Sequence, residues 1–181
     1  MNNKRFRNAY KDYQVREVRT SGGKTKREYV YTGTLYRMDV SDLNWYLIRV
    51  LQTLLFLAGV ALFAVPAVQN LTVNINAVSA FPQALAVISF FVQLIALFQY
   101  WLSSREMTEE DIKRSSKLLK PFALISAVCC GIVFIISLIF LFVNSEATVR
   151  AVLLTFLYLL SGVVMLVSYI VESRVTFVAA E

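Results

Sequence analysis

The chain has 181 residues, of which 57% are hydrophobic and 17% charged, and its formal net charge is +6 at neutral pH. Soluble domains carry about 45–50% apolar and about 25% charged residues, so this composition excludes an ordinary soluble domain and a disordered chain. Only two cysteines are present, which excludes a secreted fold held by several disulfides. Residues 50–104, 121–145 and 151–171 contain no charge. The sequence therefore indicates a multi-pass membrane protein.

The amino-terminal segment, residues 1–43, is polar and basic and contains more than half of the 18 Lys and Arg residues. It shows no short apolar stretch with a small-residue cleavage site, so we expect the first apolar helix to act as an uncleaved insertion signal. Residues 13–20 and 24–32 are rich in β-branched and aromatic residues and flank the sequence Ser21-Gly22-Gly23. Two such runs around a short glycine-containing loop predict a β-hairpin.

The charges of this segment select the register of the hairpin. A loop of residues 21–23 places Glu17 opposite Arg27 and Arg16 opposite Glu28. A two-residue Gly-Gly loop instead places Glu17 opposite Glu28, and like charges directly opposite each other are destabilising. We therefore predict the three-residue loop, with a glycine at positive φ.

The predicted register creates an aromatic face on one side of the hairpin, formed by Tyr13, Val15, Tyr29 and Tyr31. A hairpin alone is marginally stable in water, so this face needs a surface to cover it. Two interpretations stay open. The face packs on the protein's own cytoplasmic loop or on lipid headgroups, or it docks a partner protein through these residues or an open edge strand.

Two short features are predicted between the hairpin and the first apolar helix. Residues 34–38 follow Gly33 and have the composition of a third short strand. Ser41 or Asp42 is the predicted N-cap of the helix, because a side-chain oxygen there accepts a hydrogen bond from a free backbone N–H group.

The apolar blocks divide into four spans. A bilayer core about 30 Å thick requires about 20 helical residues, whereas the block 50–104 would form a helix of about 80 Å. Prolines and amides interrupt its middle, and hydrocarbon tolerates neither without compensation: Pro66, Gln69, Asn70, Asn74, Asn76 and Pro82. The predicted spans are residues 46–66, 80–102, 121–143 and 151–171.

The predicted fold class is an all-α membrane protein. A four-transmembrane-helix bundle occupies residues 44–181, and the short cytoplasmic β-hairpin lies in the basic segment 1–43. Between the second and third spans, residues 108–117 are predicted as a short helix capped by Thr108. Two pairs four residues apart favour that helix: Glu109 with Lys113, and Glu110 with Arg114. Pro121 is expected to open the third span.

The distribution of cations predicts the orientation. With these spans, every Lys and Arg except Arg150 lies at or near one side of the bundle. Cytoplasmic loops carry the excess of Lys and Arg, so we expect a protein of the cell membrane with both termini in the cytoplasm. We expect no binding of nucleic acid, because no recognition motif accompanies the positive charge.

Groups for catalysis or metal binding are not evident in the sequence. The chain has no histidine, which is the commonest general base and metal ligand. The span interiors lack Asp, Glu and Lys, and Arg49 is expected to extend to the headgroups. We therefore predict no enzymatic activity, no catalytic or metal-binding residues and no cofactor.

Neutral polar and small residues occur inside the spans at helical spacing, and the five of interest are Gln52, Gly59, Ser89, Gln93 and Gly131. Small residues allow close helix packing, and amides form hydrogen bonds between helices. We interpret these residues as packing elements of the bundle. In the alternative interpretation, Gln52, Ser89, Gln93 and Gln99 line a polar path.

These patterns lead to two functional hypotheses. In the first, the protein is a non-enzymatic accessory, regulatory or scaffold subunit in the lipid bilayer. It then engages another membrane or cytoplasmic protein through the aromatic face of the hairpin. In the second, it is a small transporter or channel formed as a homo-oligomer, since four helices enclose little pore by themselves.

Overall fold

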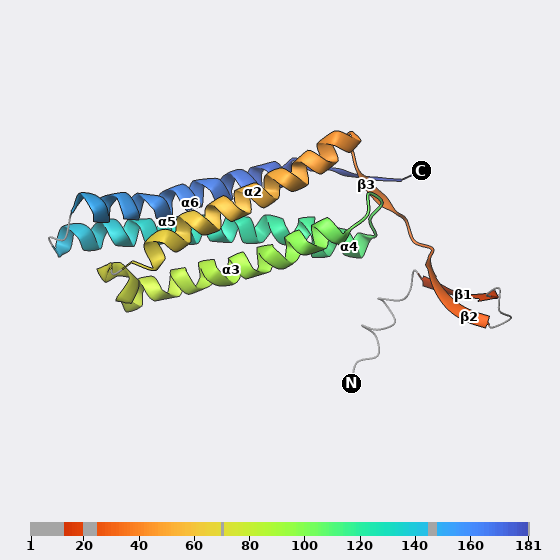
Figure 1. Ribbon diagram of the computed structural model, residues 1–181, viewed down its shortest axis with the longest axis horizontal. Helices are drawn as coiled ribbons and strands as arrows, with labels where there is room; N and C mark the ends of the chain where they lie inside the picture. Colours follow the sequence, from red (N-terminus) through yellow and green to blue (C-terminus); the bar gives the residue numbers. More distant parts are fainter. Residues whose placement is uncertain (1–12, 20–24, 70, 145–147, 181) are drawn as a thin grey trace.

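A computed structural model of the chain describes residues 13–19, 25–69, 71–144 and 148–180. Figure 1 shows the long helices side by side, with the strands beyond one end of them. The elements in chain order are β1 (Tyr13–Arg19), β2 (Thr25–Tyr31), β3 (Tyr36–Met38), α2 (Asp42–Ala67), η1 (Thr72–Ile75), α3 (Ala77–Leu102), α4 (Glu109–Arg114), α5 (Ser116–Val143), α6 (Val149–Ser173) and β4 (Phe177–Ala179).

The four predicted spans are confirmed as four long apolar helices, α2, α3, α5 and α6. Each is long and apolar enough to cross a membrane, with a mean hydropathy between 2.0 and 2.9 in its most apolar window. Large apolar side chains point away from the bundle, among them Phe81, Leu102 and Phe142, which are 74–79% exposed. Such a surface suits hydrocarbon, because lipid tails are as apolar as these side chains.

Local capping accounts for the starts of α2 and α4, whereas the start of α5 differs from the prediction. Ser41 caps α2 by accepting a hydrogen bond from the Asn44 N–H group, and Thr108 caps α4 in a reciprocal capping box. However, α5 begins at Ser116 and not at Pro121. Leu119 is buried in the bundle core, so its packing favours helix before the proline, even though Pro121 lacks a donor for the helix ladder.

Aromatic rings fill the centre of the bundle. Phe90 of α3 meets Phe56 and Phe63 of α2 edge to face, with ring centroids 6.5 and 5.4 Å apart. Phe63 also meets Tyr158 of α6 at 5.4 Å. Because edge-to-face geometry at these distances is favourable beyond the buried area alone, these rings connect three of the four spans.

One asparagine stabilises the connection between α2 and α3, which interrupts the long apolar block. The Asn74 side chain of η1 donates hydrogen bonds to the carbonyl oxygens of Pro66 and Gln69 at 2.8 Å each. Its Oδ1 accepts one from the Tyr158 hydroxyl at 2.9 Å. The carbonyl groups released at the end of α2 are thereby satisfied within the protein, as hydrocarbon requires.

The strands form two separate pairs. The hairpin has the predicted register, with Glu17 opposite Arg27 and Arg16 opposite Glu28. The predicted third strand is present as β3, but it pairs with β4 at the carboxyl end of the chain and not with the hairpin. The β-branched and aromatic residues after α6 indicate a strand, but β4 was not predicted from the sequence.

Gly162 of α6 lies against the backbone of α5, whereas the glycine predicted as a packing residue of α5 was Gly131. A Cβ atom added to Gly162 would lie 3.1 Å from the Ala127 carbonyl oxygen and 3.3 Å from the Cys130 Cβ, but one added to Gly131 would meet nothing within 4 Å. A Cβ at Gly59 would collide with the flexible end of Met165. The glycine that admits the neighbouring backbone is thus Gly162.

We expect Gly162→Ala to be less stable than Gly131→Ala. The first substitution forces α5 and α6 apart, with a cost of about 1–3 kcal/mol. The second removes backbone entropy from the unfolded chain and stabilises the helix by about 0.5–1 kcal/mol. Thermal unfolding of both variants in the same detergent measures the difference, and equal stability would contradict the assigned contact.

Candidate functional site

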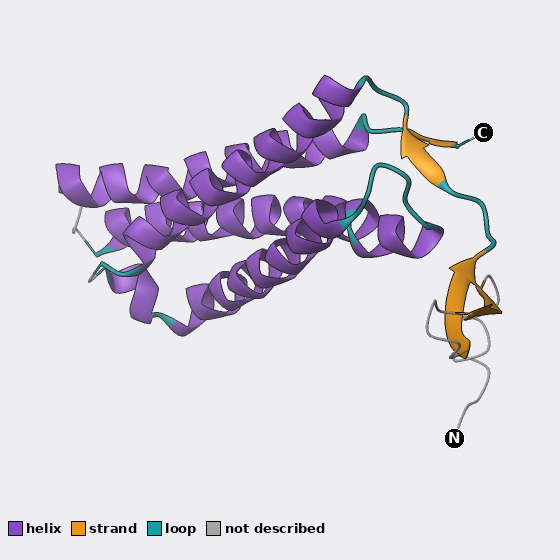
Figure 2. Cartoon of the chain, turned by 45° about the vertical axis from the view of Figure 1, so that its right-hand side comes forward, coloured by secondary structure: helices purple, strands orange, loops and turns teal. Residues whose placement is uncertain are grey.

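The two ends of the bundle differ in structure. We call the end that carries α4, β3 and β4 the strand end, and the opposite end, which carries η1, the loop end. Figures 1 and 2 show the carboxyl end and the hairpin beyond the strand end. Buried ionisable side chains gather at the strand end, which makes it the candidate functional site.

Arg49 is buried at the strand end, which corrects the expectation that it extends to the headgroups. It is 2% exposed, and its Nη1 and Nη2 both donate to the Ser103 carbonyl oxygen at 3.1 Å. Its guanidinium lies 3.8 Å from the Trp45 ring centroid and 5.1 Å from that of Tyr100. A weakly hydrated planar cation can stack on rings in this way. Ser103 caps the C-terminus of α3, where the helix dipole favours a positive charge.

One turn along α2, Gln52 connects this helix to α6. Its Nε2 donates to the Ser168 carbonyl oxygen and to Oε2 of Glu172, both at 3.1 Å. Its Oε1 accepts a hydrogen bond from the Ser168 hydroxyl at 2.6 Å. Glu172 is 2% exposed and faces Lys120 of α5. Glu172 and Ser168 are four residues apart, a spacing that indicates a shared helix face, but neither was predicted as a site residue.

Gln93 connects a different pair of helices. Its Nε2 donates to the Phe122 carbonyl oxygen at 3.2 Å and to the Ser126 hydroxyl at 2.5 Å, so it fastens α3 to α5. Ser89, one turn away, donates to Leu85 within its own helix. Gln99 is half-buried near the end of α3. The structure therefore places Gln52 and Gln93 in separate helix interfaces.

Three segments distant in sequence meet over the ends of the spans at the strand end. Tyr36 of β3 and Met107, in the connection between α3 and α4, exchange two backbone hydrogen bonds of 2.8 and 2.9 Å. The ladder between β3 and β4 continues in a hydrogen bond from Ala180 to Leu35. Beneath them, Met38, Tyr100, Met107 and Ile112 form a buried apolar cluster. We call this arrangement the strand clamp, meaning β3, β4 and residues 103–112.

The strand clamp also has polar connections to α2. Arg105 forms a salt bridge with Asp42 in the first turn of α2, and it donates to the Val40 carbonyl oxygen at 3.3 Å. The Tyr100 hydroxyl donates to the Met38 sulfur at 3.7 Å. Since Tyr100 also contacts Arg49, the buried cation lies directly beneath the strand clamp.

The hairpin lies apart from the helices in both views (Figures 1 and 2). Its register opposes Tyr13 to Tyr31 and Val15 to Tyr29, so the four predicted docking residues form two adjacent cross-strand pairs. Val15 is 54% exposed, and the Tyr31 hydroxyl donates to the Thr34 carbonyl oxygen at 3.4 Å. Among the described residues, no helix lies against the hairpin in these views.

Within the described ranges, no three His, Cys, Asp or Glu side chains are grouped closely enough to hold a metal ion. Cys129 and Cys130 are both free and buried in α5. The Cys130 sulfur lies 3.6 Å from the Ser161 hydroxyl of α6, which in turn donates to the Gly59 carbonyl oxygen at 2.8 Å. These small residues connect α2, α5 and α6 and serve the packing of the bundle.

We expect Arg49→Lys to destabilise the protein by about 1–3 kcal/mol, because an ammonium group cannot stack between two rings and also donate two hydrogen bonds to one carbonyl. The control is Arg37→Lys, since Arg37 is an exposed residue of β3. Thermal unfolding in detergent compares the two variants. A loss of stability no larger than that of the control would refute a structural role for the guanidinium.

Comparisons of the chain with protein-family models, curated proteins and solved structures found no match, so the proposals below rest on the residues and contacts of this chain.

Proposed function

We propose that the protein is a non-enzymatic accessory or regulatory subunit of a membrane complex, and that it engages a partner protein through its amino-terminal hairpin. The observation that carries this proposal is the position of the hairpin beyond the strand end, apart from the helices (Figure 1). A two-stranded hairpin is marginally stable by itself. A partner that covers its aromatic face or extends its sheet would supply the missing stabilisation.

The strand clamp supports this proposal because it gives the hairpin a fixed base. Residues 32–35 connect β2 to β3, and β3 is bound to β4 and to Met107 through backbone hydrogen bonds. A partner that binds the hairpin is therefore attached to the bundle by a short connection. In this proposal the docking residues are Tyr13, Val15, Tyr29 and Tyr31.

The proposal also places the strand end in the cytoplasm and the bundle in the cell membrane. All Lys and Arg residues except Arg150 belong to that end by sequence, as the positive-inside rule requires. Interfacial aromatic residues support this placement. Tyr46 and Trp101 meet edge to face at 5.8 Å, and the Trp101 indole donates to the Thr53 hydroxyl at 2.9 Å.

The contacts of the polar side chains favour the accessory role over a transporter. A polar path for a solute needs side chains that are free to bind it. Gln52 uses both its nitrogen and its oxygen between α2 and α6. Gln93 donates across the interface of α3 and α5, and its buried Oε1 has no partner among the described residues. These amides therefore act as fasteners between helices, of a kind that contributes about 0.6–2 kcal/mol each.

Substitution of residues on one face of the hairpin tests whether they dock a partner. We expect the double variant Tyr13→Ser/Tyr29→Ser to lose at least about 90% of the partner recovered with the wild-type protein, because aromatic anchors dominate binding energy. The measurement is quantitative mass spectrometry after in-cell cross-linking and affinity purification of the full chain in mild detergent.

The matched control for that experiment is Gln14→Ser/Val30→Thr, on the opposite face of the same strands. We expect this variant to retain the partner. A second control deletes residues 1–31 and leaves the strand clamp intact. If the deletion leaves the recovered proteins unchanged, or if both double variants behave alike, the docking proposal is wrong.

The proposed orientation can be tested by labelling introduced cysteines with a membrane-impermeant maleimide on intact cells. Position 24 is in the hairpin segment, and Val149, at the loop end, is 80% exposed. We expect Val149→Cys to be labelled from outside and Lys24→Cys to be labelled only after the cells are opened. The native cysteines are buried and provide the background signal. The reverse pattern would contradict the proposed topology.

A further inference from the structure

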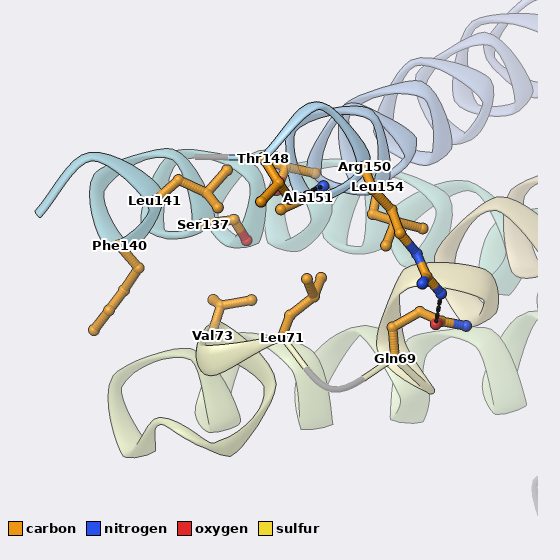
Figure 3. A pocket seen from close by; sticks show the side chains of 11 residues that line it. Gln69, Leu71, Val73, Ser137, Phe140, Leu141, Thr148, Arg150, Ala151 and Leu154 are labelled. Carbon is orange, nitrogen blue, oxygen red and sulfur yellow. Dashed lines mark hydrogen bonds between the residues drawn. The ribbon is translucent and has the colours of Figure 1, made fainter. Parts of the chain in front are cut away.

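A cavity of about 340 Å³ lies at the loop end, between η1, the last turns of α5 and the first turns of α6. Figure 3 shows Leu71 and Val73 on its η1 side and Ala151 on its α6 side. The hydrogen bond from Arg150 to Gln69, of 2.9 Å, crosses one side of the cavity. Small-molecule sites in proteins range from roughly 300 to 1,000 Å³, so the volume admits a small ligand.

The cavity has both polar and apolar lining residues, and two of the polar ones are buried hydroxyl residues. Ser137 and Thr155 are each 1% exposed. The Ser137 hydroxyl donates to the Val133 carbonyl oxygen at 2.7 Å within α5. Thr155 lines the cavity about 9 Å along α6 from the first residue of the helix. Its hydroxyl group can form a hydrogen bond with a molecule bound in the cavity.

The mouth of the cavity carries one positive charge. Arg150 is the only Lys or Arg between residues 121 and 173, and residues 50–104 contain none. Its side chain is exposed, and within the described residues it forms one hydrogen bond, to the neutral Gln69, and no salt bridge. Glu146, its nearest acidic neighbour in sequence, lies outside the described residues. The guanidinium therefore remains able to bind a carboxylate or a phosphate through two hydrogen bonds.

We propose that this cavity binds an amphiphilic anion. Its carboxylate or phosphate group lies on the Arg150 guanidinium, and its uncharged body extends past Leu71 and Leu154 toward the Thr155 hydroxyl. Each part of this ligand matches one part of the site: a cation at the mouth, apolar side chains such as Leu71 and Leu154 on the walls, and a hydroxyl group inside. The anion comes either from an anionic lipid of the adjacent leaflet or from a water-soluble organic acid.

The test uses the purified full chain in nanodiscs and two probes, one for each source. Native mass spectrometry counts phosphatidylglycerol retained from nanodiscs of mixed phosphatidylcholine and phosphatidylglycerol. Calorimetric titration of octanoate into nanodiscs of phosphatidylcholine alone tests the soluble acid. We expect one of these probes to bind the wild-type chain and to bind about tenfold more weakly to Arg150→Gln, since a charge-assisted hydrogen bond is lost.

Two further variants separate the cavity from general attraction to charge. Arg174→Gln removes an exposed cation at the strand end, and we expect it to bind the probe as the wild type does. Thr155→Val keeps the shape of the side chain but removes the hydroxyl, and we expect binding about threefold weaker. Unchanged thermal unfolding shows that each variant is folded.

Comparison of the two arginine variants with each probe shows whether the cavity binds the anion and which source supplies it. Loss of phosphatidylglycerol in Arg150→Gln but not in Arg174→Gln supports the site with a lipid source. The same pattern with octanoate supports the site with a soluble acid. If neither probe binds the wild-type chain, or if both arginine variants weaken binding equally, the proposal is overturned. These readouts do not depend on the hairpin, so the docking proposal stands or fails separately.

Discussion

Hydrocarbon offers no hydrogen bonds, so a polar group placed among the four spans is stabilised by a partner within the protein. This constraint explains the pairing of helices in the bundle. Gln52 bonds across to α6 and Gln93 across to α5, while Ser161 reaches the carbonyl oxygen of Gly59. Helices in lipid associate through packing and such polar contacts. The arrangement of the spans therefore depends on a few polar side chains together with the aromatic centre of the core.

The same constraint operates at the strand end, where charged groups meet it only in part, since Arg49 Nε and Glu172 Oε1 are buried without a partner among the described residues. Arg49 lies between two aromatic rings and binds the carbonyl oxygen that ends α3. Removal of either the rings or the carbonyl would leave a buried cation without compensation, which is far more costly than the loss of a neutral contact. This dependence explains why the connection after α3 and the strand clamp lie directly over Arg49. The clamp and the buried cation are two parts of one structural unit.

The loop end meets the constraint with neutral groups. Asn74 satisfies the carbonyl groups released at the end of α2, and Thr155 lines the cavity at this end. Among the described residues, Arg150 is the cation at this end, whereas Arg105 and Arg174 belong to the strand end. The two ends are thus built for different contacts: a folded clamp with a projecting hairpin at one, and an open cavity with a single charge at the other.

The sequence by itself determined the features that depend on short-range patterns. The charge-free blocks define four spans, Thr108 defines the start of α4, and the alternation of charges in residues 13–31 selects the hairpin register. These features follow from hydropathy, from capping and from cross-strand charge pairing, each of which acts over a few residues.

Only the tertiary structure decided which distant residues meet. Nothing near β3 in sequence indicates that its partner is β4, because strand pairing over such a separation depends on where the bundle ends bring the two segments. From the sequence alone, Arg49 is expected to contact the headgroups, because the packing of Trp45 and Tyr100 on it is known only from the folded bundle. Likewise, Gly162 can be distinguished from Gly131 only once α5 and α6 are packed. A side chain's environment in the membrane is set by neighbouring helices, and the order of residues along one helix does not contain that information.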